Sequence, residues 1–252
     1  MARYTLIELP SADSTNTYAR NLSINPDDST PLVIVTDNQT SGRGQRGNSW
    51  ESHPGQNLTF SLVLYPRMFA PARQFELSML VSVGIVNALK KHIETTARVS
   101  IKWPNDIYID DRKVAGILIE NTLSSSCIEK SVIGIGINVN QQHFESDAPN
   151  PVSLVHVIGK ETNLKQLLDN IVQAILDMYE SYVYDPEPDE LTYLYNTLLW
   201  RHDGRTYTWH DTASDTDFEA TLIGVDCDGT LSLKDTGGTI RHYLFKEVSA
   251  VF

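Results

Sequence analysis

A helix that is apolar around most of its circumference constrains this chain more than any other feature. Residues 72–93 have helical spacing, and their apolar members are Phe75, Leu77, Leu80, Val81, Val83, Ile85, Val86 and Leu89. Such a helix must be covered on several sides, because only a narrow polar stripe is suited to water. The neighbouring apolar segments are short and β-branched, as buried strands are; they cover 32–36, 57–65, 99–103, 106–109, 114–121 and 128–139. The sequence therefore predicts helices packed against a sheet.

Further elements complete the domain organisation. Helical spacing recurs at 164–182 and 189–200, residues 1–9 alternate as a short strand does, and Ser14 or Thr15 is an N-cap candidate for a helix ending near Leu22. From about Gly204, short β-rich segments alternate with turn signals at 211–217, 228–229 and 237–238. We therefore expect an α+β fold, with a large domain over residues 1–200 and a small β domain over residues 201–252.

The charge balance argues against nucleic acid as a partner. The 252 residues include 32 acidic and 20 basic side chains, for a net charge of −12, whereas a protein that neutralises many phosphates carries a basic face. The N-terminus has no signal-peptide pattern, and no apolar run approaches the roughly 20 residues of a membrane span. Cys127 and Cys227 have no CxxC partner, which favours free thiols in a reducing compartment. We expect a cytoplasmic protein that binds neither DNA nor membranes.

The loop at 42–47, Gly-Arg-Gly-Gln-Arg-Gly, formally matches the GxGxxG pattern of dinucleotide-binding proteins. In those proteins a helix opens directly after the glycines. Here Asn48-Ser49-Trp50 leads through a turn-rich stretch to a strand, which disfavours a nucleotide-binding oxidoreductase. Two interpretations stay open. The loop is either an anion site, in which backbone amides and arginines bind phosphate or carboxylate, or a solvated surface loop.

The string Lys102-Trp103-Pro104-Asn105-Asp106 stands at a corner between two predicted strands. A lysine, an amide and a carboxylate in one turn suit a polyanion with a metal ion, because a carboxylate binds Mg²⁺ directly or through water. The alternative is a turn with ordinary surface charges. Lys113, at the start of the next strand, either reaches into a pocket beside an anionic partner or lies along the surface.

Glycines inside two predicted strands are a third unusual feature. Gly116 and the run Gly134-Ile135-Gly136-Ile137-Asn138 weaken their strands unless something packs closely against the backbone. One interpretation is a flat ligand near Gly116, with sugar or base contacts from Asn138; the other is a β-bulge. The seven histidines show no metal-ligand spacing.

Together and in order, these motifs resemble those of the biotin protein ligases. The matching stretches are 14–16, Gln39 with 41–44, 102–106, 112–120 and 134–138, and the resemblance covers essentially the whole chain. It implies a mixed sheet with packed helices, shared with lipoate ligases and related to class II aminoacyl-tRNA synthetases, plus an SH3-like C-terminal β barrel. It also implies an enzyme that joins biotin to ATP, with Mg²⁺, and passes biotin to a lysine of a biotin carboxyl carrier protein.

The resemblance also assigns roles to residues. The implied catalytic residues are Lys113 and Arg43. Asp106 joins them on chemical grounds, as the candidate acceptor of the proton that the carrier lysine must lose. The implied biotin-binding residues are Ser14, Thr15, Asn16, Gln39, Gly42, Arg43, Gly44, Gln45, Lys113 and Gly116. The implied ATP-binding residues are Arg43, Arg46, Trp50, Lys102, Asn105, Lys113 and Asn138. The ligands of the metal are not assigned.

One position departs from the family's pattern. Many relatives have an arginine where this chain has Gln45, and that arginine helps to retain the adenylate; Arg46 is the candidate substitute. The Ser-Thr-Asn motif starts at residue 14, which leaves no room for the DNA-binding winged helix of the longer members, so no repressor function is expected. Two alternatives stay open, a lipoate or octanoate ligase on the same fold and a non-catalytic biotin sensor. A homodimer is compatible with the resemblance.

Overall fold

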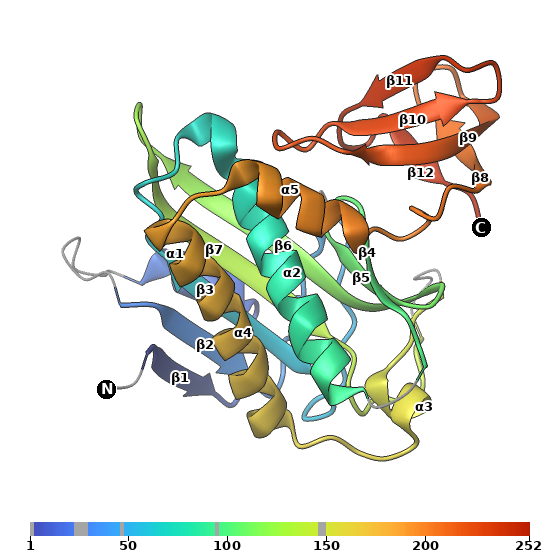
Figure 1. Cartoon of the computed structure of the whole chain (residues 1–252). Helices are drawn as coiled ribbons and strands as arrows, with labels where there is room; N and C mark the ends of the chain where they lie inside the picture. Colours follow the sequence, from blue (N-terminus) through green and yellow to red (C-terminus); the bar gives the residue numbers. More distant parts are fainter. Residues whose placement is uncertain (1–2, 23–29, 46–47, 94–95, 146–149) are drawn as a thin grey trace.

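The computed structural model describes residues 3–22, 30–45, 48–93, 96–145 and 150–252. Its elements form a large sheet covered by helices and a smaller sheet built from the C-terminal residues (Figure 1). Within these ranges, no helix combines the length and the apolar character needed to cross a membrane.

The large sheet is mixed, as predicted. Its strands are β1 (Thr5–Leu9), β2 (Leu32–Thr36), β3 (Leu58–Leu64), β4 (Val99–Lys102), β5 (Asp106–Ile109), β6 (Arg112–Leu123) and β7 (Ile128–Ile137), in the order β1-β2-β3-β7-β6-β5-β4. β1 and β2 are parallel, and the other neighbouring pairs are antiparallel. At the β4 edge, Ile101 exchanges two backbone hydrogen bonds of 2.8 Å with Leu198 and Trp200. These bonds satisfy polar groups that an edge strand otherwise exposes.

A layer of helices covers one face of this sheet: α2 (Gln74–His92), α4 (Leu164–Tyr184) and α5 (Pro188–Thr197) (Figure 1). α2 is buried on most sides, as its apolar circumference predicts, because it packs against the sheet and against both α4 and α5. Gly84 allows α2 and α4 to approach closely, since a Cβ at this position would lie 2.8 Å from Ile175 Cα. The sequence did not predict α3 (Leu154–Ile158), because 5 residues are too few to show a helical period.

β7 shows how the sheet divides its side chains between two faces. Successive side chains of a strand point to opposite faces. Ile133, Ile135 and Ile137 therefore enter the core beneath the helices, and Gly134 and Gly136 face the other side. The register of β7 with β3 and β6 is unbroken at both glycines, so the β-bulge considered for this run does not occur.

The opposite face of the sheet carries the short helix α1 (Thr15–Asn21). Ser14 is its N-cap and accepts a hydrogen bond from the Thr17 N–H. Ala19 packs into a small separate core with Ile34, Val63 and Val132. α1 packs mainly on β2, β3 and β7 and reaches β6 through Asn16, so most of the face of β6 and β5 is left for a site.

The C-terminal residues form the predicted small β unit. Its strands β8 (Thr206–Asp211), β9 (Thr216–Val225), β10 (Leu231–Asp235), β11 (Ile240–Tyr243) and β12 (Val248–Ala250) form an antiparallel sheet in the order β11-β10-β9-β8-β12 that curls like a barrel (Figure 1). Trp103 Nε1 donates a 3.0 Å hydrogen bond to the Gly229 carbonyl and so ties this unit to the large sheet. The domain boundary between residues 200 and 201 stays a prediction.

Candidate active site

A row of facing residues crosses five strands on the open face of the large sheet. The register places Thr59 of β3 opposite Gly136 of β7, and Gly136 opposite Gly116 of β6. Gly116 faces Asp106 of β5, which in turn faces Lys102 of β4. Neighbouring strands lie about 4.8 Å apart. The row therefore forms a trough, which has no side chains at Gly136 and Gly116 and ends at the carboxylate of Asp106 and the amine of Lys102.

A β-bulge turns Lys113 toward this trough. The pairing of β5 with β6 shifts register and leaves Val114 as an extra residue in β6. A bulge changes the face to which the adjoining side chains point. As a result, Lys113 Nζ lies 2.7 Å from Asp106 Oδ1, and Lys102 Nζ lies 4.0 Å from Asp106 Oδ2.

Two lysines thus share one carboxylate in partly buried surroundings. The side chains of Lys102, Lys113 and Asp106 are 23%, 27% and 17% exposed. Burial lowers the pKa of Lys102 below its ordinary value; Asp106 acts against this shift and Lys113 adds to it. With two cations and one anion, the cluster carries one net positive charge and can attract an anionic group.

Trp50 lies across the bare part of the trough. A Cβ on Gly136 would lie 2.7 Å from Trp50 Cζ2, and one on Gly116 would lie 3.1 Å from Trp50 Cζ3, so the indole rests on the backbone of both strands. Lys113 Nζ lies 5.7 Å from the ring centre, within the range of a cation–π contact. The backbone N–H of Trp50 donates to the Gly42 carbonyl at 3.0 Å, and a Cβ on Gly42 would overlap the backbone carbonyl oxygen of Trp50. The strand glycines therefore admit a flat group, and that group is a side chain of the protein.

Buried polar side chains from α1 and β3 lie at the other end of the trough. Ser61 Oγ lies 2.7 Å from Thr15 Oγ1 and 2.6 Å from Asn16 Oδ1. Asn16 Nδ2 donates to the Leu118 carbonyl at 3.2 Å and to Glu120 Oε2 at 2.8 Å. Ser61, Thr15 and Asn16 are all buried. These groups form a continuous hydrogen-bonded chain beside the trough.

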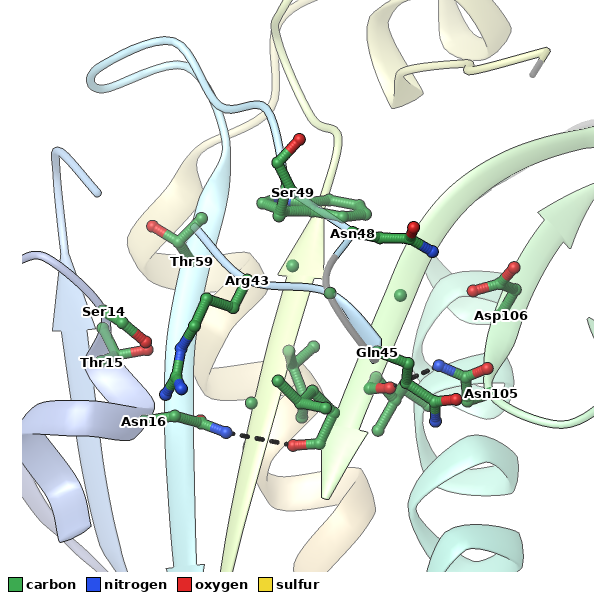
Figure 2. Close-up of a pocket in the computed structure, with 18 of the residues that line it drawn as sticks. Ser14, Thr15, Asn16, Arg43, Gln45, Asn48, Ser49, Thr59, Asn105 and Asp106 are labelled. Atoms are coloured by element: carbon green, nitrogen blue, oxygen red, sulfur yellow. Dashed lines mark hydrogen bonds between the residues drawn. The ribbon is translucent and has the colours of Figure 1, made fainter. Parts of the chain in front are cut away.

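The loop after β2 brings Arg43 and Gln45 to the cavity. Arg43 Nη2 donates to Thr17 Oγ1 at 2.9 Å and lies 3.7 Å from Glu120 Oε2, so the guanidinium points toward α1 (Figure 2). Gln45 Oε1 is buried and has no hydrogen-bond partner among the described residues. Arg46 lies outside the described residues.

Trp50, the two lysines with Asp106, the loop residues Arg43 and Gln45, and the α1 residues Thr15 and Asn16 all line one cavity of about 220 Å³. Figure 2 shows the polar residues of α1 on one side and Asn105 with Asp106 on the other. Most residues predicted from the sequence line this cavity: Ser14, Thr15, Asn16, Gln39, Arg43, Gly44, Gln45, Trp50, Lys102, Asn105, Asp106, Lys113 and Gly116. The fold thus brings together motifs that are far apart in the chain, while the role of each residue stays a prediction.

Two predicted residues lie behind the lining. Gly42 supports the Trp50 backbone, as described above. Asn138 is buried, and its Nδ2 donates to the Val152 carbonyl at 3.2 Å and to the Lys113 carbonyl at 3.5 Å. Its amide therefore braces the start of β6, and its contact with ATP stays a prediction.

Some lining residues were missed from the sequence. Thr59 had a usable signal, because Thr59 and Ser61 alternate with apolar residues in the segment predicted as a strand and so share one face. Asn48 and Ser49 follow the glycine loop directly. Phe245 had no local signal, because it reaches the cavity from the C-terminal unit.

Fold and site together define a class: an α+β protein whose mixed sheet carries a cluster of cationic side chains beside the buried polar side chains of Thr15, Asn16 and Ser61. A family model described as the biotin/lipoate A/B protein ligase family matches residues 8–138. The chain is 34% identical over 181 residues to the biotin ligase of acetyl-CoA carboxylase from Paracoccus denitrificans, covering 68% of this chain and 74% of the relative. The chain belongs to the biotin/lipoate A/B protein ligase family.

Further relatives extend this comparison. The chain is 30% identical over 218 residues to the bifunctional ligase/repressor BirA of Bacillus subtilis; the match covers 84% of this chain but 64% of that relative's length. The structure of a biotin protein ligase from Aquifex aeolicus in complex with biotin and ATP superposes with a TM-score of 0.79, at 26% identity, over 97% of both chains. Over the matched part, the chain therefore has the fold of that enzyme.

Proposed function

We propose that the protein is a biotin protein ligase, which activates biotin with ATP to biotinyl-5′-AMP and transfers biotin to a lysine of a biotin carboxyl carrier protein. One observation carries the proposal: a single cavity is lined at one end by the polar side chains of Thr15 and Gln39 and at the other by the cations Lys113 and Lys102. An enzyme that activates a carboxylic acid needs a binding site for the acid and a positively charged region where its carboxylate meets the phosphate. The names of the Paracoccus relative and the Aquifex structure support this reading.

The proposed first step joins two anions. An oxygen of the biotin carboxylate attacks the α-phosphorus of ATP, the bond from that phosphorus to the bridging oxygen breaks, and pyrophosphate leaves. Lys113, Lys102 and Arg43 are the groups that we expect to neutralise the accumulating charge. Lys113 Nζ lies 2.7 Å from Asp106 Oδ1. An entering phosphate competes with that carboxylate for a lysine that is already aligned along the trough.

In the proposed second step the carrier lysine attacks the carbonyl carbon of the mixed anhydride, and AMP leaves. A lysine amine is protonated in water, with a reference pKa of about 10.4, so it must first lose a proton. Asp106, once Lys113 turns to the phosphate, is the proposed acceptor. Residues 38–45 and 48–50, among which Trp50 covers the trough, are proposed to exclude water from the adenylate.

Mg²⁺ fits the site through one carboxylate. No group of three His, Cys, Asp or Glu within the described ranges is arranged to hold a metal. Mg²⁺ does not require such a group, because it usually keeps several waters and binds one or two carboxylates together with substrate phosphates. Asp106 is the carboxylate that would hold the ion during the first step, and the ion would there supply charge neutralisation at the phosphates.

We also propose that the protein works in the cytoplasm and does not bind DNA. The net charge of −12 supports the second statement, because phosphate backbones attract basic surfaces. A repressor role, which the printed name of the Bacillus relative includes, is not part of the proposal. A monomer and a homodimer both agree with the position of β1 at the sheet edge, and sedimentation velocity distinguishes them.

Mass spectrometry of an acceptor protein tests the proposed function. A biotin carrier domain is incubated with the protein, MgATP and biotin, with lipoate as the parallel substrate. We expect a mass gain of one biotinyl group with the unaltered protein and with Lys234→Ala, a control on an exposed face of β10. Lys113→Ala should abolish the gain.

Two outcomes would contradict this proposal in different ways. A mass gain with lipoate alone would assign the protein to the lipoate ligases. If no carrier gains mass, and calorimetry shows biotin binding that ATP does not affect, the protein is a biotin sensor.

A further inference from the structure

A second cavity lies between the large sheet and the C-terminal β unit. Its volume is about 270 Å³, compared with about 220 Å³ for the cavity of the candidate active site. On one side it is bounded by residues 102–104 and by Leu199 and Trp200, which follow α5. On the other side its walls come from β8, β9, β10 and β12 of the C-terminal unit. The proposed function gives this cavity no occupant.

Most of the wall of this second cavity is hydrocarbon. Leu199, Trp209, Leu222, Leu231 and Val248 line it, and each of them is at most 5% exposed. An apolar cavity stays dry and takes up apolar molecules, and a cavity of about 150 Å³ already holds a benzene ring. By that measure, the second cavity has room for an apolar body of up to roughly ten carbon atoms.

The three tryptophans of the wall have no ring N–H left for a ligand. Trp103 Nε1 donates to the Gly229 carbonyl at 3.0 Å, and Trp209 Nε1 donates to a backbone carbonyl of β9 at 3.1 Å. Trp200 Nε1 donates to Asp111 Oδ1 at 2.9 Å. Sugars and nucleobases need hydrogen-bond partners when they are buried, so this wall disfavours both. It favours a ligand whose buried part has no polar groups.

The charged residues in the lining are two lysines, Lys102 and Lys246. Lys246 lies on an exposed turn, with its Nζ 5.9 Å from the centre of the Phe245 ring, and has no ion-pair partner among the described residues. The carboxylate of the neighbouring Glu247 is engaged elsewhere, because Oε2 accepts from the Leu244 N–H at 2.7 Å. In a chain with a net charge of −12, this cavity therefore combines an apolar wall with positive charge, which suits an anionic end group.

The two cavities share part of their lining, namely Lys102, Pro104 and Phe245. Lys102 also belongs to the cluster with Lys113 and Asp106, which carries one net positive charge. A carboxylate that pairs with Lys102 from the second cavity cancels this charge. The phosphates of ATP, which we expect at the same cluster, are then attracted less strongly.

We propose that the second cavity is a binding site for a monocarboxylic acid with an apolar body of up to roughly ten carbon atoms. The hydrocarbon part occupies the space between the tryptophan and leucine side chains, and the carboxylate pairs with Lys246 and Lys102. Through Lys102, the bound acid weakens the binding of ATP, and ATP weakens the binding of the acid by the same factor. This inference goes beyond the proposed function, because the activation of biotin does not require a second acid.

Calorimetry with decanoate tests the site on the full chain. Biotin is present at saturation, so that decanoate is kept out of the first cavity. Decylamine, which is cationic at neutral pH, is the probe of equal length and opposite charge. Ala250→Leu adds three carbon atoms at the wall of the second cavity, and Ala213→Leu is its control in an exposed turn of the same β unit. Lys246→Met removes one of the two charges, and Lys234→Met on the exposed face of β10 is the matched control.

The unaltered protein should bind decanoate at least about 10-fold more tightly than decylamine, because like charges repel at the two lysines. Ala250→Leu should weaken decanoate binding at least about 10-fold without lowering the melting temperature, since a side chain that fills a cavity does not destabilise the fold. Lys246→Met should weaken decanoate binding about 3-fold or more, and both controls should bind decanoate as the unaltered protein does. Saturation with decanoate should raise the dissociation constant for ATP at least about 5-fold.

Several results would overturn the inference. Equal affinities for decanoate and decylamine would show that the lysines do not select the ligand. Decanoate binding that survives in Ala250→Leu, or that displaces biotin, would place the acid outside the second cavity. If Ala250→Leu does not fold, Lys246→Met decides, and an unchanged affinity for decanoate in that variant refutes the site. An unchanged affinity for ATP would refute the link through Lys102. A protein that binds decanoate as expected but does not bind biotin would refute the proposed function and leave this site standing.

Discussion

Replacing Gly136 by alanine should displace Trp50 rather than unfold the sheet. The new methyl carbon would lie 2.5 Å from Trp50 Nε1 and 2.7 Å from Cζ2, whereas carbon contacts begin at about 3.5 Å. The indole must therefore move by about 1 Å. Overpacking costs about 1–3 kcal/mol. Trp50 belongs to a partly exposed loop, so we expect about 1 kcal/mol, or a fall of roughly 2–4 °C in melting temperature.

The effect on ligand binding should be larger than the effect on stability. The methyl group and the displaced indole both take space from a cavity of about 220 Å³. We expect the dissociation constant for biotin, measured by calorimetry, to rise about 10-fold or more, which corresponds to about 1.4 kcal/mol. Gly237→Ala is the control, since a Cβ there meets Asp235 Oδ1 at 3.3 Å, in a hairpin of the C-terminal unit.

A double-mutant cycle shows whether Trp50 carries the effect. In a Trp50→Ala background no indole is left to clash, so Gly136→Ala should cause little further loss of biotin affinity. The reasoning is refuted if Gly136→Ala binds biotin as the unaltered protein does, or if the loss is the same with and without Trp50.

Three further perturbations address other parts of the site. Gln45→Arg places a guanidinium in the cavity, where the buried amide oxygen of Gln45 has no hydrogen-bond partner among the described residues. The guanidinium can bind the phosphate, so the adenylate should dissociate at least about 10-fold more slowly in a filter-binding assay. An unchanged dissociation rate would show that this position does not face the phosphate. Trp103→Phe removes the donor to the Gly229 carbonyl and should destabilise the protein by about 1 kcal/mol in urea unfolding, and equal stability would refute that role. EDTA should abolish carrier biotinylation but preserve biotin binding in calorimetry; labelling that survives chelation would contradict a metal held at Asp106.

The sheet and its long helices were predictable because their patterns are long. The segment at 57–65 alternates Thr59 and Ser61 with apolar residues, and α2 is apolar over five turns, so each pattern repeats often enough to be recognised. The charged and glycine-rich motifs also indicated the site, because charges and strand glycines need a physical reason to occur inside a sheet.

The geometry within the site was not predictable from these patterns. A regular alternation along β6 would place Lys113 and Gly116 on opposite faces, and only the register shift at Val114 brings the lysine to Asp106. Phe245 approaches from the C-terminal β unit, a relation that no local pattern contains. Pairing between distant segments, which depends on the whole fold, decided both positions.

The shared carboxylate gives a prediction whose sign differs between two variants. Burial lowers the pKa of Lys102, Asp106 raises it and Lys113 lowers it. Lys102 must be protonated to attract the phosphates of ATP, so the affinity for ATP should decline as the pH rises through its lowered pKa.

Asp106→Asn removes the carboxylate that raises the pKa of Lys102 and should move this decline to lower pH. Lys113→Met removes a lowering influence and should move the decline to higher pH, although it weakens binding overall. Calorimetric titration with ATP, from neutral to alkaline pH, measures both shifts. If both variants move the decline in the same direction, the two lysines do not share one electrostatic site, and the cation cluster on which the proposed activation of biotin depends would need another account.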